Sequence, residues 1–255
     1  MHLPLHEYIL ASVGSVALAC LSVRLVVSRL ASVYKFFFFY VLVDLIQTSE
    51  PFWLRFGSNW YGHIFLITEG IMLCLYVLIV FELYSVLFKE LKGIARLAQR
   101  FTAFALVASV AIALALRTVL PQPRSVIEVF FYFESAVILS LAAFILLITA
   151  FVVYYPVPLY RNVVIYSMGY AVYFLSKAAL LFLNNAGNSA WIRLWSTLAL
   201  VVSIATVGFW TVFLNRAGEQ RTIVVGRRWA DSTAQQQILK RLNELNESLA
   251  RARGK

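Results

Sequence analysis

The sequence predicts an all-α membrane protein built as a bundle of seven transmembrane helices. Hydrophobic residues make up 62% of the 255 positions and charged residues only 13%, a balance that is typical of integral membrane proteins. The apolar residues fall into seven runs separated by short polar breaks. A helix needs about 20 residues to cross about 30 Å of hydrocarbon, so each run suits one span.

Polar breaks and prolines limit the first four expected helices. The first covers residues 7–27, and the second covers residues 34–51, where Pro51 ends it because proline lacks a backbone N–H and disfavours a helical residue before it. The third covers residues 60–91 and leads into a basic loop. The fourth covers residues 101–119 and stops before Pro121 and Pro123.

The last three expected helices are separated in the same way. The fifth covers residues 125–155 and is ended by Pro156 and Pro158. The sixth covers residues 160–185, and a turn of three asparagines and a glycine within residues 184–188 separates it from the seventh, at residues 190–214. Residues 1–215 are therefore expected to form the transmembrane domain and residues 216–255 a basic tail.

The distribution of cations predicts the orientation. The side that holds the loops after helices one, three and five, together with the tail, carries 17 Lys and Arg residues, and the opposite side carries four. The positive-inside rule places the richer side in the cytoplasm. We therefore expect the amino terminus outside the cell membrane and the carboxyl terminus inside. On that side Glu82 is expected to reach toward Lys89, Lys92 or Arg161.

The tail is expected to contain an amphipathic helix. Ile238, Leu242, Leu245 and Leu249 repeat at steps of four, three and four, the spacing of one helix face. Three uses remain open: contact with anionic lipid headgroups, favoured by nine tail cations; a homodimer through these four residues; and docking on a partner. No nucleic-acid partner is predicted.

A lysine inside the sixth helix predicts a polar interior. An ammonium group at the centre of a membrane helix costs roughly 3 kcal/mol, so Lys177 should face inward and meet an anionic partner. Tyr166, Tyr170, Tyr173 and Lys177 lie at steps of four, three and four, which places them on one face of the helix.

Three acidic residues are expected at the same depth as Lys177. Asp44, Glu69, Glu134 and the lysine each lie seven to nine residues from the outer end of their expected helices, which corresponds to roughly 10–14 Å below the outer boundary. The candidates for ligand or ion binding are Asp44, Gln47, Glu69, Glu134, Tyr170, Tyr173 and Lys177. Two interpretations remain: a structural ion pair with polar contacts that hold helices together, or a cavity that binds a cation or handles protons.

Two stretches of the tail carry a resemblance. Residues 225–229, Val-Gly-Arg-Arg-Trp, followed by residues 242–248, Leu-Asn-Glu-Leu-Asn-Glu-Ser, resemble a group of uncharacterised bacterial seven-helix membrane proteins. The resemblance implies a bacterial inner membrane and a short regulatory or anchoring tail, and it implies no activity.

These observations favour a non-catalytic protein of the receptor or sensor class, with an outward-facing polar pocket coupled to the tail. An ion- or proton-coupled transporter is the alternative, and a membrane-embedded lipid-modifying enzyme is a third hypothesis. We predict no catalytic residue, metal site or cofactor, because the sequence has no zinc-protease, nucleophile-elbow or phosphate-loop motif and its three histidines form no ligand pattern.

Overall fold

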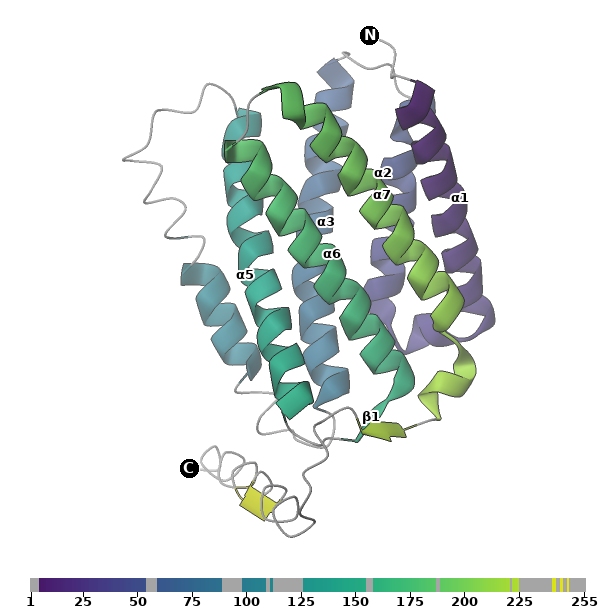
Figure 1. Ribbon diagram of the computed structural model, residues 1–255, viewed down its shortest axis with the longest axis vertical. Coiled ribbons are helices and arrows are strands. Elements are labelled where there is room, and N and C mark those ends of the chain that lie inside the picture. Colours follow the sequence, from purple (N-terminus) through teal and green to yellow (C-terminus); the bar gives the residue numbers. More distant parts are fainter. Residues whose placement is uncertain are drawn as a thin grey trace.

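In the residues that it describes, the computed structural model is helical apart from one short strand pair (Figure 1). It describes residues 5–53, 59–88, 98–108, 111, 126–154, 158–186, 189–220, 222–224, 240, 241, 244 and 247. The long helices in this part of the chain are α1 (Leu5–Val27), α2 (Lys35–Trp53), α3 (Asn59–Leu87), α5 (Val126–Tyr154), α6 (Arg161–Ala186) and α7 (Ser189–Phe213). Residues 98–108 form a further helical segment.

Four helices contain stretches that are long and apolar enough to cross a membrane: Tyr8–Val27, Gly62–Leu87, Val129–Phe151 and Arg161–Leu180. Helix α7 has a shorter apolar stretch, Thr197–Phe213. Helix α2 carries Asp44 and four further polar residues at positions 47–50, which lowers its apolar character. The structure thus supports a helical membrane protein, while seven spans and their orientation stay predictions.

Most helix ends lie within two residues of their expected positions, and the end of α3 differs by four. Helix α2 continues past its expected end at Pro51 to Trp53. Pro51 lacks the backbone N–H that would donate to the preceding turn. The helix tolerates this loss because Pro51 lies in its last turn. Helix α3 ends at Leu87 and Phe88 is in a turn, four residues before the expected end at residue 91; residues 89–91 lie outside the described residues. Most of the expected helix at residues 101–119 lies outside the described residues.

The six long helices form a closed ring. Each of α1, α2, α3, α5, α6 and α7 contacts the next, and α7 contacts α1; α3 also contacts α6 across the ring. The ring encloses an aromatic core, and the largest fully buried side chains among the described residues are Tyr34, Phe37, Tyr40, Tyr76, Tyr166, Tyr170, Phe174 and Trp210. These rings pack mostly edge to face or tilted, as between Phe37 and Trp210 with centroids 5.0 Å apart, and such pairs contribute about 0.5–1.5 kcal/mol beyond burial.

Two charged side chains bind helix ends. Arg24 of α1 donates from Nε to the Leu214 carbonyl at 2.9 Å, just beyond the end of α7, where a cation complements the helix dipole. Glu82 of α3 accepts hydrogen bonds from the backbone N–H groups of Phe36 and Phe37 at 3.2 and 3.3 Å, at the start of α2. The Glu82 carboxylate thus satisfies orphan N–H groups of a neighbouring helix. Lys89 and Lys92, two of its expected basic partners, lie outside the described residues, so its reach toward a basic side chain stays a prediction.

The start of the tail packs on the bundle. After α7, the 3-10 helix η2 (Arg216–Glu219) leads to strand β2 (Thr222–Val224), which pairs antiparallel with β1 (Pro158–Tyr160) immediately before α6. The register joins Leu159 with Ile223. This pairing was not expected from the sequence, because three-residue strands leave no recognisable alternation. The leucine positions of the expected tail helix lie outside the described residues; residues 240, 241, 244 and 247 are helical and exposed.

Candidate functional site

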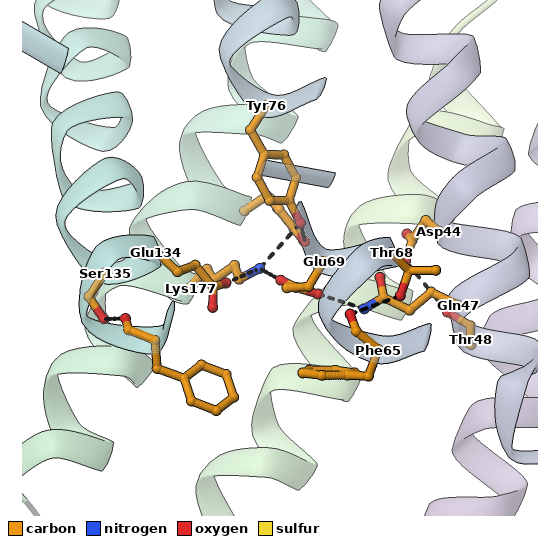
Figure 2. Close-up of polar contacts among 12 residues, drawn as sticks. Asp44, Gln47, Thr48, Phe65, Thr68, Glu69, Tyr76, Glu134, Ser135 and Lys177 are labelled. Carbon is orange, nitrogen blue, oxygen red and sulfur yellow. Dashed lines mark hydrogen bonds and ion pairs between the residues drawn. The ribbon is translucent and has the colours of Figure 1, made fainter. Parts of the chain in front are cut away.

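Lys177 lies between two carboxylates from neighbouring helices (Figure 2). Its Nζ atom is 2.9 Å from Oε1 of Glu69 on α3 and 2.8 Å from Oε1 of Glu134 on α5. The Glu134 side chain is only 2% exposed, so this carboxylate depends on its protein partners. The prediction that Lys177 meets acids from other helices is confirmed.

The helix geometry explains why these residues meet. Lys177 is nine residues before the last residue of α6, Glu69 is ten residues after the first residue of α3, and Glu134 is eight residues after the first residue of α5. At 1.5 Å per residue these side chains leave their helices at nearly one level. Since α3 and α5 both contact α6, that level brings the three charges together. We call Lys177, Glu69 and Glu134 the lysine layer.

Polar neighbours extend the lysine layer in two directions. Gln47 of α2 donates to Oε2 of Glu69 at 2.5 Å, which satisfies the oxygen that Lys177 does not contact. Lys177 also donates to the Tyr76 hydroxyl at 3.3 Å and lies 4.8 Å from the centroid of that ring, within the range of a cation–π interaction. The hydroxyls of Tyr76 and Tyr173 are 2.8 Å apart. Gln47 and Tyr173 are thus brought to the lysine layer, as their helix faces predicted.

Asp44 and Tyr170 lie beside the lysine layer and form none of its hydrogen bonds. Oδ1 of Asp44 accepts a hydrogen bond from Thr48 at 3.5 Å, one turn along α2, although its charge is close enough to interact with Lys177 and Glu69. Tyr170 is fully buried among aromatic rings. Asp44 therefore lies near Lys177, as the shared depth predicted, but it does not pair with the lysine directly, because its side chain is hydrogen-bonded within its own helix.

Sequence reasoning missed a fourth buried acid near this end of the bundle. Glu50 on α2 is 1% exposed and accepts a hydrogen bond from Thr68 on α3 at 3.2 Å. Its position beside Pro51 suggested a helix end at the membrane surface. Its burial follows from the continuation of α2 through the proline, which the sequence pattern did not indicate.

A second polar cluster joins α6 to the tail. Nδ2 of Asn162, in the first turn of α6, donates to the Asn215 carbonyl at 2.7 Å and to Oε1 of Glu219 at 2.8 Å. The Tyr34 hydroxyl, just before α2, donates to the same Glu219 oxygen at 2.7 Å. Asn215 caps η2 by accepting from the N–H of Gly218 at 2.8 Å. We call Tyr34, Asn162, Asn215 and Glu219 the tail clasp.

The tail clasp is buried and closely packed. Asn162 and Tyr34 are fully buried, and a Cβ atom at Gly218 would overlap the Asn162 side chain, so only glycine permits this approach. Burial and the adjacent Glu219 carboxylate raise the pKa of the Tyr34 hydroxyl well above its ordinary value of 10.0. The hydroxyl therefore stays a hydrogen-bond donor at neutral pH. The sequence offered no signal for these contacts, whose partners are more than fifty residues apart.

Among the described residues, no group of three or more His, Cys, Asp and Glu side chains is arranged to hold a metal ion. Cys20 and Cys74 are free and exposed. Comparison with protein-family models, curated proteins and solved structures found no match.

Proposed function

We propose that this protein is a receptor- or sensor-like membrane protein in which a change of charge in the lysine layer is transmitted through α6 to the cytoplasmic tail. One observation carries the proposal: a single helix joins the two sites. Helix α6 holds Lys177 nine residues before its last residue and Asn162 of the tail clasp in its first turn.

The stimulus that suits the lysine layer is a proton or a cation. One ammonium group faces two carboxylates, and Asp44 adds a third acid within electrostatic range. Unpaired negative charge inside a bundle is costly, and binding of a proton or a cation removes that cost. Such binding weakens the attraction of one carboxylate for Lys177 and so changes the force on α6.

Contacts at the start of α6 support a route for the proposed signal to the tail. Strand β1 directly precedes α6, and its partner β2 follows η2. A rotation or shift of α6 therefore acts on both β1 and Asn162, which hold the first residues of the tail. Packed interfaces of this kind respond to small shifts by adopting a second arrangement.

Spin labels at Lys35 and Gln220 would test this coupling. Both side chains are exposed, and they lie on α2 and just after η2. The exposed native cysteines Cys20 and Cys74 are first replaced by alanine. We expect Glu69→Gln and Glu134→Gln each to change the label-to-label distance distribution, measured by electron paramagnetic resonance in lipid nanodiscs.

Two matched variants make this result decisive. Glu50→Gln neutralises a buried acid that hydrogen-bonds Thr68 rather than Lys177, and it should leave the distribution unchanged. Asn162→Ala breaks the tail clasp directly and should broaden it. A change with Asn162→Ala but none with Glu69→Gln or Glu134→Gln would contradict the proposed coupling, because the labels would report on the tail while the lysine layer left it unaffected.

A proton- or ion-coupled transporter is the second candidate, and the excess of acids over Lys177 favours it. In proteoliposomes that enclose a pH-sensitive dye, this candidate predicts proton or solute flux under a gradient that is abolished by Asp44→Asn, Glu69→Gln or Glu134→Gln. Flux of this kind would count against the sensor proposal. The absence of flux under any imposed gradient would exclude the transporter.

A further inference from the structure

Three buried oxygen atoms near the centre of the ring have no hydrogen-bond partner among the described residues. They are the hydroxyls of Tyr40 and Tyr170 and the Oδ2 atom of Asp44. Both tyrosines are fully buried. An unsatisfied polar group inside a membrane protein costs several kcal/mol, and nearly all buried polar groups in proteins are paired with protein or water.

These atoms belong to adjacent side chains. Asp44 lies one helical turn after Tyr40 on α2, and the ring centroids of Tyr40 and Tyr170 are 6.1 Å apart. The side chains that carry the three atoms thus follow one another between α2 and α6, and we call these three atoms the orphan cluster.

The orphan cluster lies between two hydrogen-bonded groups. On one side, the Tyr40 ring centroid is 5.6 Å from that of Tyr76, which contacts both Tyr173 and Lys177. On the other side, the Tyr170 ring centroid is 4.9 Å from that of Tyr166, whose hydroxyl donates to Glu82 at 3.3 Å. The orphan cluster therefore occupies the interval between the lysine layer and the carboxylate at the start of α2.

We propose that the orphan cluster is a binding site for water. Tyrosine hydroxyls donate and accept hydrogen bonds, whereas the Asp44 carboxylate only accepts. Water can form hydrogen bonds with both kinds of group at once, because it donates and accepts. It needs two to four polar partners to be held in a protein interior. A bare cation would need acceptors alone. The Trp210 N–H also has no hydrogen-bond partner among the described residues, and its ring centroid lies 4.8 Å from that of Tyr170. Because this N–H can only donate, it favours water over a cation. Water at this site links the lysine layer to Glu82 by hydrogen bonds.

Removal of single hydroxyl groups tests the proposal by the sign of the effect. If water binds the hydroxyls, Tyr40→Phe and Tyr170→Phe each remove a hydrogen bond and lower the thermal unfolding midpoint in detergent. If the hydroxyls are dry and unsatisfied, the same variants remove a buried polar penalty and raise the midpoint. Tyr84→Phe is the matched control, because the Tyr84 hydroxyl accepts a hydrogen bond from Thr102 at 3.1 Å, and its loss should lower the midpoint.

Radiolytic hydroxyl-radical labelling gives a second measurement on the unmodified protein. Radicals form from water next to the labelled side chain, so Tyr40 and Tyr170 should be labelled in a brief X-ray pulse although they are fully buried. Phe88, which is buried against Phe151 and Tyr84, should stay unlabelled. Labelling of both tyrosines together with lowered midpoints supports the proposal. Absent labelling together with raised or unchanged midpoints overturns it, whatever the tail-coupling experiment shows.

Discussion

Lys177 is the residue on which the polar interior depends. It is the partner of two buried carboxylates, and its ammonium group also contacts Tyr76. Buried ion pairs contribute little net stability compared with apolar replacements, but removal of one partner leaves an uncompensated charge. The lysine layer is therefore sensitive to single substitutions and tolerant of complete neutralisation.

We expect Lys177→Met to lower the free energy of unfolding by about 3–5 kcal/mol, because Glu69 and Glu134 then lose their counter-ion. The combined variant Lys177→Met, Glu69→Gln, Glu134→Gln should recover most of this loss. Unfolding in a mixed-micelle denaturant series would measure both changes. If Lys177→Met alone were as stable as the parent protein, the ion pairs of the lysine layer would make no net contribution to the free energy of unfolding.

Tyr34 should make the stability depend on alkaline pH. Its pKa is raised in the folded state, so the unfolded state loses the hydroxyl proton first. The stabilisation is fully present below pH 10, the ordinary value, and decreases as the pH rises above it, by at most about 1.4 kcal/mol per pH unit.

Tyr34→Phe provides the comparison for this pH effect, since it lacks the ionisable hydroxyl. Between pH 9 and pH 11 the parent protein should lose stability relative to the variant. Parallel curves for the two proteins would contradict the prediction.

At the scale of elements, close packing of α6 on α7 depends on one glycine. A Cβ atom at Gly169 of α6 would overlap the Trp210 indole, and Trp210 is fully buried against Phe37 and Tyr170. The helices approach at this point because the glycine has no side chain. Small residues allow such close approach in membrane bundles.

Gly169→Ala should therefore lower the free energy of unfolding by about 1–3 kcal/mol through overpacking. Gly208→Ala on α7 is the matched control: a Cβ atom there meets no other atom within 4 Å, so the higher helix propensity of alanine should leave stability unchanged or raise it by up to about 1 kcal/mol. Thermal unfolding of both variants in the same detergent checks this. Equal midpoints for the two would mean that Trp210 can move at little cost.

At the scale of the whole molecule, the ring of helices is linked at its ends by polar contacts between distant segments. Arg24 connects α1 to the end of α7, and Glu82 connects α3 to the start of α2. The tail clasp and the β1–β2 pair connect α6 to the residues after α7. The last two of these links attach the beginning of the tail to the helix that carries Lys177.

Seven spans with an outside amino terminus predict where reporters become active. A periplasm-active enzyme fused after residue 57 or residue 123 should be active. The same enzyme fused after residue 94 or residue 220 should be inactive. A fluorescent protein that folds only in the cytoplasm should show the opposite pattern. The physical basis is the cation excess on the second set of loops. The reverse pattern at all four positions would invert the orientation. Activity of the periplasm-active enzyme at residue 220 as well as at residues 57 and 123 would indicate an even number of spans.

The helices could be predicted from the sequence because their signals are local. Apolar runs and prolines placed most ends within two residues, and the spacing of Tyr166, Tyr170 and Lys177 identified the inward face of α6. The cost of a charge in hydrocarbon also required an anionic partner for Lys177 before any contact was known.

The partners themselves depended on the packing of the ring. Lys177 pairs with Glu69 and Glu134 rather than Asp44 because α3 and α5 flank α6 at that level, whereas the Asp44 side chain turns along α2. The tail clasp joins residues that neither spacing nor composition connects. By itself the sequence determined that the chain forms apolar helices and that a charged face must be buried, since both follow from hydrogen bonding and solvation within one helix. Only the tertiary structure decided which side chains complete that face and that α6 also holds the tail, because those contacts form between helices that are distant in the chain.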